Sequence, residues 1–563
     1  MNRDEALASV RQDPHVSVLI VGAGINGIGT FRDLARNGVD VLLIDRADFC
    51  SGASAASSHM AHGGIRYLEN GEFRLVREAV QERNYMIENA PHIVRPLPTT
   101  IPIFRIFSGL LNAPLKFLGL LDRPSERGSL VIKIGLMLYD AYTGRQRTVP
   151  RHRFMNRQES LDRWSQLNPA VVHTATYYDG AILQPERLGL ELILDAEAEN
   201  ARAHALNYVS LHGQDGQSVV LRDDLTGTTY KVMPRILVNA TGPWIDLTNR
   251  ALGCETRLIG GTKGSHLVLD HAELRQAIGE HEFFFENKDG RIVLIFPLYD
   301  RVLVGTSDVA VEDADAVRCT DEEVDYFLGL VKRVFPTITV SRAHIVFRFS
   351  GVRPLATSRS RTTGQITRDH EIRVVEGGQT GLPFPIYALV GGKWTSWRAF
   401  SEQAADKCLA QLGITRNAST RRVPVGGGRG YPASAEERRR LLAHLAEDLH
   451  GSDDRAEVLF ERYGTRALEV ARFEAAGVGA PMPSLPAYSR AEIEFMAETE
   501  KVVHLDDVLL RRSMLAMLGR ATREGAIEIA DVLAGRLKWD SAHQEAEISR
   551  TLQILKEKHQ VEL

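Results

Sequence analysis

Four cationic side chains and one histidine follow glycine-rich or serine-rich turns and strands in this chain: Arg66, Arg353, Arg368, Lys393 and His266. The planar fork of arginine offers parallel N–H donors, which suit an anionic group such as a phosphate. A neutral imidazole has a pKa close to neutrality, so it suits a proton acceptor. Each residue alone has an ordinary alternative, a surface salt bridge for an arginine and a hydrogen-bonded strand residue for His266. These residue types indicate anion binding and proton transfer, and other elements must position them.

A glycine-rich turn near the start of the chain lies between a predicted strand and a predicted helix. Residues 16–21 have the length and apolar character of a buried parallel strand, and residues 28–36 are compatible with a helix. Gly22 permits a tight turn, Gly24 lets the backbone approach a pyrophosphate, and Gly27 lets the helix pack on the strand. The helix N-terminus offers free N–H groups and a partial positive charge to phosphates. The turn therefore predicts a bound dinucleotide.

Later segments return the chain to this predicted nucleotide domain. A second apolar strand, residues 39–44, ends at Asp45, near the ~20-residue distance at which a carboxylate meets a ribose hydroxyl. Another strand ends in Ala-Thr241-Gly242, and a third leads into Gly391-Gly392 and a helix over residues 395–412. The alternating segments between them, joined by Gly/Asp turns, predict an inserted antiparallel sheet.

The loop over residues 50–73 is rich in serine and glycine, so its backbone is able to approach a flat cofactor closely. The run from Ser57 to Val76 resembles the signature loop of FAD-dependent glycerol-3-phosphate dehydrogenases, with His59 where that family commonly has a lysine. Four motifs match the family in its order: Arg66-Tyr67, Lys-Gly-Ser-His266, Gly-Val-Arg353-Pro and Gly-Gly-Lys393.

The resemblance implies FAD as the cofactor, no metal, and oxidation of sn-glycerol 3-phosphate to dihydroxyacetone phosphate, with ubiquinone or menaquinone as electron acceptor. It implies His266 and Arg353 as catalytic residues, without deciding which handles the proton. It implies Arg66, Tyr67, Arg368 and Lys393 as substrate ligands, with the flavin as an alternative contact for Lys393. The implied cofactor-binding residues are Gly22, Gly24, Asn26, Gly27, Asp45, Arg46, Ser54, Ser57, Ser58, His62, Gly63, Gly64, Thr241, Gly242, Gly391, Gly392 and Thr395.

Three alternatives to this function stay open. The same site would serve an oxidase that passes electrons to O2 and releases H2O2. A flavoenzyme of amino or hydroxy acids would share the fold, although the cationic residues favour a phosphate. A nucleotide-binding structural subunit of a redox complex would place the chemistry in a partner.

The expected fold class is α/β with an α+β insert: a two-part Rossmann-like FAD-binding domain, a D-amino-acid-oxidase-like antiparallel-sheet substrate domain and a C-terminal all-helical domain. The capping boxes Ser434-x-x-Glu437 and Ser489-x-x-Glu492 support that helical domain, and Thr320-x-x-Glu323 predicts a helix in the insert. The predicted division is a tail (1–15), the FAD-binding domain (16–100, 145–256 and 350–415), the substrate-binding cap (101–144 and 257–349), a linker (416–432) and the helical domain (433–563).

Composition limits the partners and the compartment. The 563 residues carry a net charge of −4 and no basic tract, so nucleic acid is not expected. The four cysteines form no CxxC pair, which fits a reducing cytoplasm. The N-terminus is polar and charged, unlike a secretory signal. The apolar tract 103–121 fits a buried helix pair, a monotopic face on the inner side of the cell membrane or the rim of a quinone pocket. This choice stays open, as does a homodimer.

Overall fold

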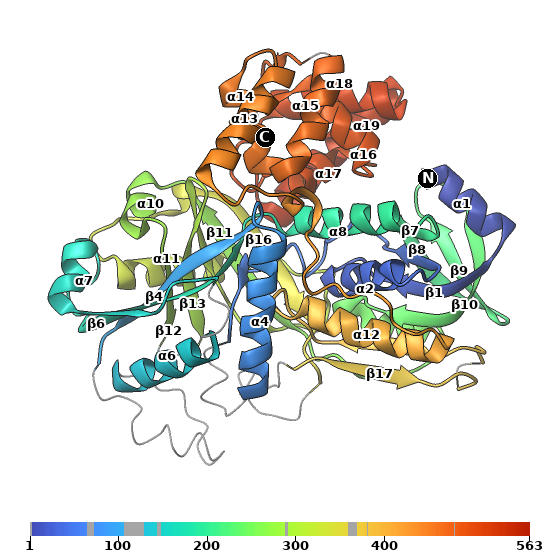
Figure 1. Ribbon diagram of the computed structural model, residues 1–563, viewed down its shortest axis with the longest axis horizontal. Coiled ribbons are helices and arrows are strands. Elements are labelled where there is room, and N and C mark those ends of the chain that lie inside the picture. Colours follow the sequence, from blue (N-terminus) through green and yellow to red (C-terminus); the bar gives the residue numbers. More distant parts are fainter. Residues whose placement is uncertain are drawn as a thin grey trace.

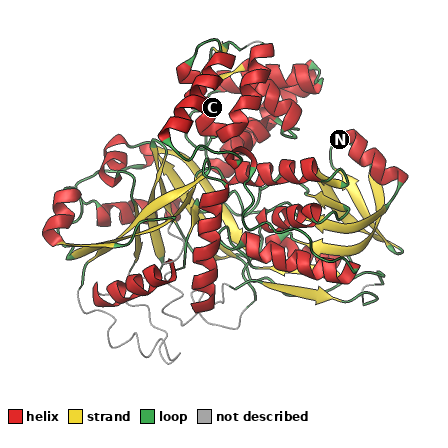
Figure 2. Ribbon diagram, viewed as in Figure 1, coloured by secondary structure: helices red, strands yellow, loops and turns green. Residues whose placement is uncertain are grey.

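A computed structural model describes residues 3–64, 73–105, 129–143, 148–287, 291–357, 369–379, 381–477 and 479–563. Two sheets lie side by side beneath a helical region formed by the C-terminal part of the chain (Figure 1). Colouring by secondary structure shows that this upper region is almost entirely helical (Figure 2). The structure thus confirms the predicted α/β architecture with a helical C-terminal domain.

The first sheet has a parallel centre, in the order β17-β18-β10-β1-β2-β7. Strand β1 pairs in parallel with both β10 and β2, β10 with β18, and β2 with β7, while β17 runs antiparallel to β18. Segments far apart in sequence therefore end at one edge of the sheet. The strands are β1 (His15–Val21), β2 (Val41–Ile44), β7 (Ala203–Leu206), β10 (Thr229–Asn239), β17 (Glu371–Val375) and β18 (Ile386–Val390), with β8 (Val209–Asp215) and β9 (Ser218–Asp223) joined through β10.

The two faces of this sheet are covered by different elements, because its strands alternate buried side chains between two cores. Val18 and Ile20 pack with α2 (Ile25–Arg36), α8 (Pro185–Glu199) and α12 (Trp397–Leu412). Leu19 and Val21 pack on the other face, with Ala6 and Leu7 and with side chains of β8 and β9. Ala6 and Leu7 belong to α1 (Arg3–Gln12), so the residues predicted as a tail include a helix that packs on the sheet.

The second sheet is mostly antiparallel, in the order β15-β11-β14-β13-β12-β4-β6-β3, with β16 on β11 and β5 on β6. Its strands are β3 (Met60–Ala61), β4 (Val94–Ile103), β5 (Arg153–Asn156), β6 (His173–Ile182), β11 (Thr262–Leu269), β12 (Glu282–Glu286), β13 (Ile292–Leu298), β14 (Arg301–Gly305), β15 (Val309–Ala310) and β16 (Ile345–Arg353). Four of them, β3, β4, β5 and β6, lie mainly or wholly within the ranges predicted for the FAD-binding domain. They join the second sheet because β3, β4 and β5 all pair with β6, and β4 does so along its full length.

One face of the second sheet is closed by short helices. These are α7 (Arg157–Arg163), α10 (Ala272–Ile278) and α11 (Asp321–Val334), whose apolar side chains share one core with Leu267, Val293 and Val304 of the sheet. The predicted capping box that opens α11 is confirmed: Thr320 accepts from the Glu323 N–H, and the Glu323 side chain accepts from the Thr320 N–H.

The other face of the second sheet contacts the C-terminal helices. Phe347, Phe349 and Leu294 share a core with them. The helices are α13 (Ala435–Asp448), α14 (Asp453–Tyr463), α15 (Ala467–Ala476), α16 (Arg490–Thr499), α17 (Leu505–Asp507), α18 (Arg523–Leu537) and α19 (Ser541–His559), with a small hairpin of β19 (Pro481–Met482) and β20 (Leu485–Ser489). Ser434 and Ser489 cap α13 and α16 as predicted.

Two further helices lie at the lower side of the molecule as drawn in Figure 1. Helix α4 (Phe73–Asn89) and helix α6 (Ser129–Thr143) form a core with Ala175 and Tyr177 of β6. Helix α9 (Ile245–Ala251) follows β10. Among the described residues, no helix has both the length and the apolar character needed to cross a bilayer.

Candidate active site

A cavity of about 1580 Å³ lies where the two sheets and the C-terminal helices meet. Small-molecule pockets are usually ~300–1,000 Å³, so this cavity has room for a large cofactor and a small substrate. Its wall includes the carboxyl ends of β1 and β10, the loop 51–58, the end of β16 and residues 391–395. The carboxyl edge of a parallel sheet is where α/β folds bind nucleotides.

The glycines of the first turn are required by close backbone packing. A Cβ on Gly22, whose φ is +103°, would lie 2.6 Å from the Ala240 carbonyl oxygen, and one on Gly27 would lie 2.0 Å from the Gly22 carbonyl oxygen. Gly22 and Gly24 line the cavity, whereas Gly27 does not. Gly27 therefore packs helix on strand, and Gly24 leaves the backbone accessible.

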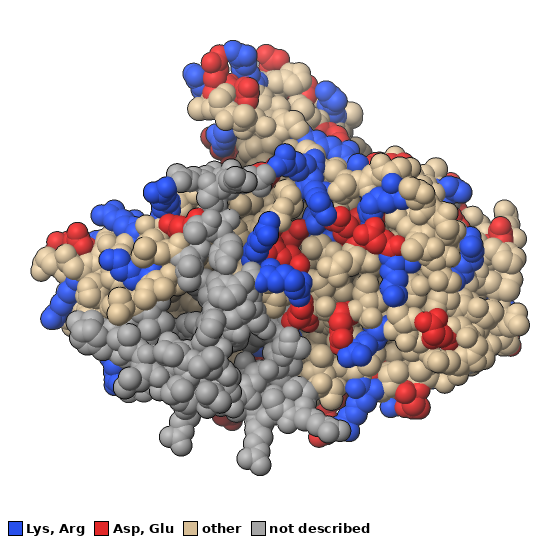
Figure 3. All heavy atoms as spheres, turned by 60° about the horizontal axis from the view of Figure 1, so that its bottom comes forward, with Lys and Arg blue, Asp and Glu red and all other residues tan. Residues whose placement is uncertain are grey.

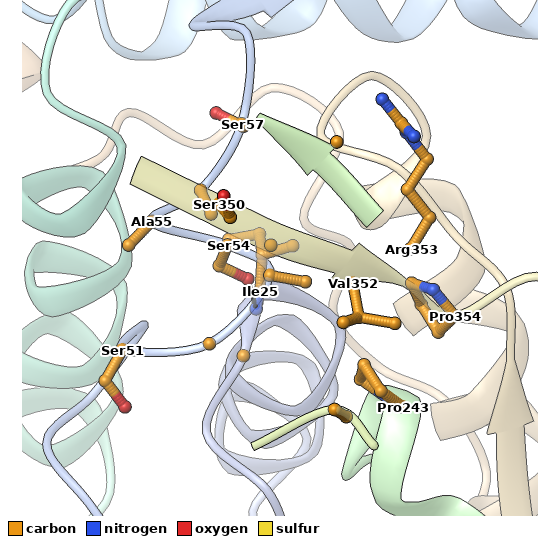
Figure 4. Close-up of a pocket in the computed structure, with 18 of the residues that line it drawn as sticks. Ile25, Ser51, Ser54, Ala55, Ser57, Pro243, Ser350, Val352, Arg353 and Pro354 are labelled. Carbon is orange, nitrogen blue, oxygen red and sulfur yellow. Dashed lines mark hydrogen bonds between the residues drawn. The ribbon is translucent and has the colours of Figure 1, made fainter. Parts of the chain in front are cut away.

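The N-terminus of α2 faces the cavity from below the end of β16 (Figure 4). The Ile25 N–H donates to the Ser54 hydroxyl at 3.0 Å, so the loop 51–58 is tied to the start of the helix. Asp45, at the end of β2, accepts from the N–H groups of Ala23 at 2.7 Å and Ala47 at 2.9 Å. Burial raises the pKa of Asp45 to about 6, which leaves the carboxylate ionised at neutral pH.

Among the described residues, two buried polar atoms on the cavity wall have no hydrogen-bond partner in the described part of the chain. They are Oδ1 of Asn26, whose Nδ2 donates to the Gly391 carbonyl at 3.1 Å, and Nε1 of Trp244. Buried polar atoms are normally hydrogen-bonded, so an acceptor and a donor left over here indicate a polar ligand. With the glycine turn and Asp45, they fit a dinucleotide such as FAD.

The remaining predicted cofactor residues gather around the same cavity, with one exception. Arg46, Ser54, Ser57, Ser58, His62, Gly64, Thr241, Gly242, Gly391, Gly392 and Thr395 all line it. The guanidinium of Arg46 lies over the Trp244 ring at 4.6 Å and pairs with Asp315 at 2.5 Å. The exception is Gly63, which lies against Tyr139 instead. A Cβ at this position would be only 1.9 Å from the Tyr139 hydroxyl oxygen.

Arg353 lines the cavity at the end of β16, where Figure 4 shows its side chain extending beyond the strand. Its guanidinium donates to the Thr306 hydroxyl at 2.9 Å and to the Ser307 carbonyl at 3.0 Å, and lies 3.3 Å from Asp308. These contacts orient a cation at the wall, and its side chain remains 30% exposed. Lys393 lines the cavity as well.

His266 does not line the cavity, contrary to what its predicted role as base suggests. Its side chain stacks on Phe349 with ring centroids 4.8 Å apart, and the residue is only 2% exposed. Its Nε2 lies 2.9 Å from the hydroxyl of Ser58, which does line the cavity. Burial, then the positive charge of Arg353, hold the pKa of His266 well below its ordinary value, so the ring is neutral. The pairing of β11 with β16 turns His266 toward Phe349, a register that sequence spacing does not reveal.

His59, the position at which the resembling family commonly has lysine, is fully buried. Its Nδ1 contacts the Ile182 carbonyl at 3.1 Å, and its ring meets Phe349 edge-on at 6.5 Å. Burial lowers the pKa of His59 to about 4, so this position holds a neutral ring.

Three predicted substrate ligands, Arg66, Tyr67 and Arg368, lie outside the described residues. Sequence reasoning also missed residues on the cavity wall, among them Tyr177, Asp179 and Trp244. Asp179 carried a usable signal, an acidic residue within the otherwise uncharged strand 173–182. In the described part of the chain, three or more side chains able to ligate a metal do not come together at any one place.

Figure 3 shows the charge on one face of the molecule. On the face turned forward in Figure 3, basic and acidic side chains are interspersed among the parts that are described. The described parts of that face show no broad patch of positive charge, the kind of surface that binds nucleic acid.

Comparison with known proteins agrees with the cofactor geometry. Residues 17–394 match the family model of FAD dependent oxidoreductases. Residues 418–544 match the C-terminal domain of alpha-glycerophosphate oxidase. Residues 395–417 lie between the two matches, and the second match begins inside the segment 416–432 predicted as a linker.

Curated relatives match the chain over most of its length. It is 34% identical to a glycerol-3-phosphate dehydrogenase of Synechocystis, over 90% of both chains. It is 32% identical to a glycerol-3-phosphate dehydrogenase of Pseudomonas aeruginosa, covering 89% of this chain and 92% of that protein.

Solved structures share the fold. The Bacillus halodurans glycerol-3-phosphate dehydrogenase complexed with FAD superposes with a TM-score of 0.76 at 22% identity, covering 99% of this chain and 97% of that one. The Mycoplasma pneumoniae L-alpha-glycerophosphate oxidase with FAD bound has a TM-score of 0.53 at 16% identity, covering 72% and 97%.

Proposed function

The chain belongs to the FAD-dependent glycerol-3-phosphate dehydrogenase family, and from this membership we propose that it oxidises sn-glycerol 3-phosphate to dihydroxyacetone phosphate. The observation that carries the proposal is Arg353, a cation oriented on the wall of the same cavity that holds the glycine turn. The carbonyl product forms through a developing alkoxide, and a cation placed at the reacting oxygen stabilises that negative charge.

Bound FAD supplies the hydride acceptor for the carbon that is oxidised. The protein must then take the hydroxyl proton and stabilise the oxygen. A guanidinium stays protonated throughout the accessible pH range, so Arg353 stabilises the negative charge that develops on that oxygen. In this proposal His266 takes the proton through Ser58: the serine hydroxyl gives its proton to Nε2 of His266 as it receives the proton of the substrate hydroxyl.

The phosphate is assigned to cationic and hydroxyl side chains. By the family resemblance, these are Arg66, Tyr67, Arg368 and Lys393. Among them Lys393 lies in the described part of the chain and lines the cavity. Several charge-assisted hydrogen bonds would select a phosphorylated substrate over free glycerol.

We propose a membrane quinone, ubiquinone or menaquinone, as the electron acceptor. Helix α6 supports this because Leu130, Ile134 and Met137 are 43%, 51% and 58% exposed on it, at helical spacing. An exposed apolar stripe on one helix is suited to lie in a membrane interface. The protein would then bind the inner face of the cell membrane peripherally, as a monomer or a homodimer.

The same cavity is compatible with O2 as acceptor, which would make the protein an oxidase releasing H2O2. The homology of residues 418–544 to the alpha-glycerophosphate oxidase C-terminal domain supports keeping this second candidate. One experiment tests both. The purified protein should reduce a dye or a soluble quinone with sn-glycerol 3-phosphate but not with glycerol. Stoichiometric O2 uptake and H2O2 release in the absence of quinone would favour the oxidase, and failure to reduce any acceptor would reject the proposal.

A further inference from the structure

Asp179 of β6 is a buried carboxylate on the cavity wall, outside the machinery assigned above. It is 1% exposed, and burying a charge is costly unless hydrogen bonds and an opposite charge compensate it. Its Oδ1 accepts the Gly63 N–H at 2.8 Å and the Tyr139 O–H at 2.7 Å. The Arg83 guanidinium lies 3.6 Å away.

The Gly63 N–H belongs to the turn at residues 62–64, of which His62 and Gly64 line the cavity. Gly63 itself faces the other way. A Cβ there would lie within 2.7 Å of three atoms of the Tyr139 side chain, so the glycine and the tyrosine fit tightly together. The Gly63 N–H bond to Asp179 therefore ties the backbone between the two cavity-lining neighbours to β6.

Tyr139 brings a second element to the same point. It lies on α6, and its ring meets Tyr177 edge-on at 5.7 Å. Arg83 of α4 donates to the Tyr139 hydroxyl at 2.7 Å and to the Tyr178 carbonyl at 2.6 Å. Helices α4 and α6 and strand β6 thus converge on the turn through side chains that are almost fully buried.

We propose that Asp179 and Tyr139 are positioning residues that hold the turn 62–64 against the bound flavin cofactor. The hydroxyl of Tyr139 orients the carboxylate, and the carboxylate holds the Gly63 N–H. This proposal depends on the proposed function only in taking FAD as the ligand of the cavity.

The first test compares Tyr139→Phe with Tyr85→Phe in the purified holoenzyme. Both changes remove a hydroxyl from a buried ring, but Tyr85 bonds Gln81 on α4 and does not line the cavity. FAD release on dilution is followed by flavin fluorescence, and the flavin environment by visible circular dichroism. Tyr139→Phe should weaken FAD retention about tenfold and alter the dichroism, the effect of losing one buried hydrogen bond. Tyr85→Phe should leave both signals unchanged.

The second test separates two properties of the Asp179 side chain, its hydrogen-bond acceptor oxygen and its negative charge. Asp179→Asn keeps an oxygen for the Gly63 N–H but loses the charge beside Arg83, whereas Asp179→Ala loses both. Both variants should lower Tm, but the flavin dichroism should be disturbed far more in Asp179→Ala. Equal flavin signals in Tyr139→Phe and Tyr85→Phe, or equal disturbance in Asp179→Asn and Asp179→Ala, would overturn the proposal. If Asp179→Ala does not fold, the tyrosine pair and Asp179→Asn still decide it. These signals are read without substrate, so absent glycerol 3-phosphate oxidation in the unsubstituted protein would reject only the proposed function.

Discussion

Nε2 of His266 lies 2.9 Å from Oγ of Ser58, and it is the serine hydroxyl that lines the cavity. The histidine is stacked behind it on Phe349. A proton that leaves the substrate is therefore expected to reach the buried imidazole through a second side chain. The test of the predicted base must therefore include Ser58 as well as His266, because both side chains are needed for this proton transfer.

His266→Ala and Ser58→Ala should each lower kcat by about 10²–10⁴-fold, the usual contribution of a proton-transfer residue. FAD should remain bound in both. If they act as one relay, the double variant should be no slower than the worse single variant. Steady-state kinetics with an artificial acceptor, beside flavin absorbance, measures this. Near-normal turnover of His266→Ala across the pH range would remove it as the base.

The pH profile follows from the buried imidazole. Burial and the positive charge of Arg353 hold the pKa of His266 well below its ordinary value, so the neutral, proton-accepting form persists as pH falls below 6.5. The acid limb of the kcat profile should therefore lie below pH 6.5. An acid limb at or above 6.5 that disappears in His266→Ala would contradict the buried position of the ring.

Arg353→Ala should reduce kcat by about 10²–10³-fold, the effect of removing one donor to a developing oxyanion. Arg348→Ala is the matched control on the same strand, since Arg348 pairs with Asp321 at 3.0 Å and does not line the cavity. The control should keep its kcat. Equal losses in both variants would mean that Arg353 acts through the stability of β16.

The exposed stripe on α6 predicts binding to lipid. Replacing Ile134 and Met137 together by glutamate should reduce co-sedimentation with vesicles of bacterial lipid several-fold, because charges oppose burial in the interface. Dye reduction in solution should be retained. Ile527→Glu on α18, where the native side chain is 38% exposed, is the control that should bind as before. Unchanged sedimentation of the double variant would argue against a membrane role for α6.

Stability should depend on pH through Glu282. Burial, reinforced by the charge of Asp179, raises the pKa of Glu282 to about 8. Because the folded-state pKa lies above the unfolded value, the contribution of this group to stability is complete below about pH 4.3 and is lost as pH rises through about 8. Glu282→Gln should therefore become more stable relative to the unsubstituted protein between pH 5 and pH 8, by up to a few kcal/mol. Urea unfolding at pH 5 and pH 8 measures this, with Glu280→Gln at an exposed position as the control. If Glu282→Gln and the unsubstituted protein differed in unfolding free energy by the same amount at both pH values, the prediction would be wrong.

The C-terminal helices are joined to the nucleotide domain by a buried ion pair. Arg187 of α8 donates to both carboxylate oxygens of Glu500, at 2.7 and 2.9 Å, and each side chain is at most 1% exposed. Glu500→Ala should lower the free energy of unfolding by about 3–5 kcal/mol, because Arg187 would be left buried without its partner. Glu498→Ala, at a partly exposed surface pair with Arg536, should change it by less than about 1 kcal/mol. Similar midpoints in denaturant for both variants would contradict this ranking.

Local sequence patterns determined the elements that build the cofactor site. The order strand, Gly22 turn, helix and Asp45 follows from residue types within about thirty positions, and the structure has β1, α2 and β2 there. Fifteen of the seventeen predicted cofactor residues line the cavity, because the carboxyl ends of parallel strands meet at one edge of a sheet. The caps at Thr320, Ser434 and Ser489 were likewise predictable, since capping uses side chains three residues apart.

Only the tertiary structure decided which face each residue presents. Gly63 belongs to a run of cavity residues, yet it packs on Tyr139 because α6, some seventy residues later, lies against that turn. His266 is in a matching motif, yet the register of β11 on β16 places its ring on Phe349 behind Ser58. Strand β6 joined the second sheet through its pairing with β4 and brought Asp179 to the cavity wall. Such pairings between distant segments depend on the packing of the whole core, and no spacing along the chain encodes them.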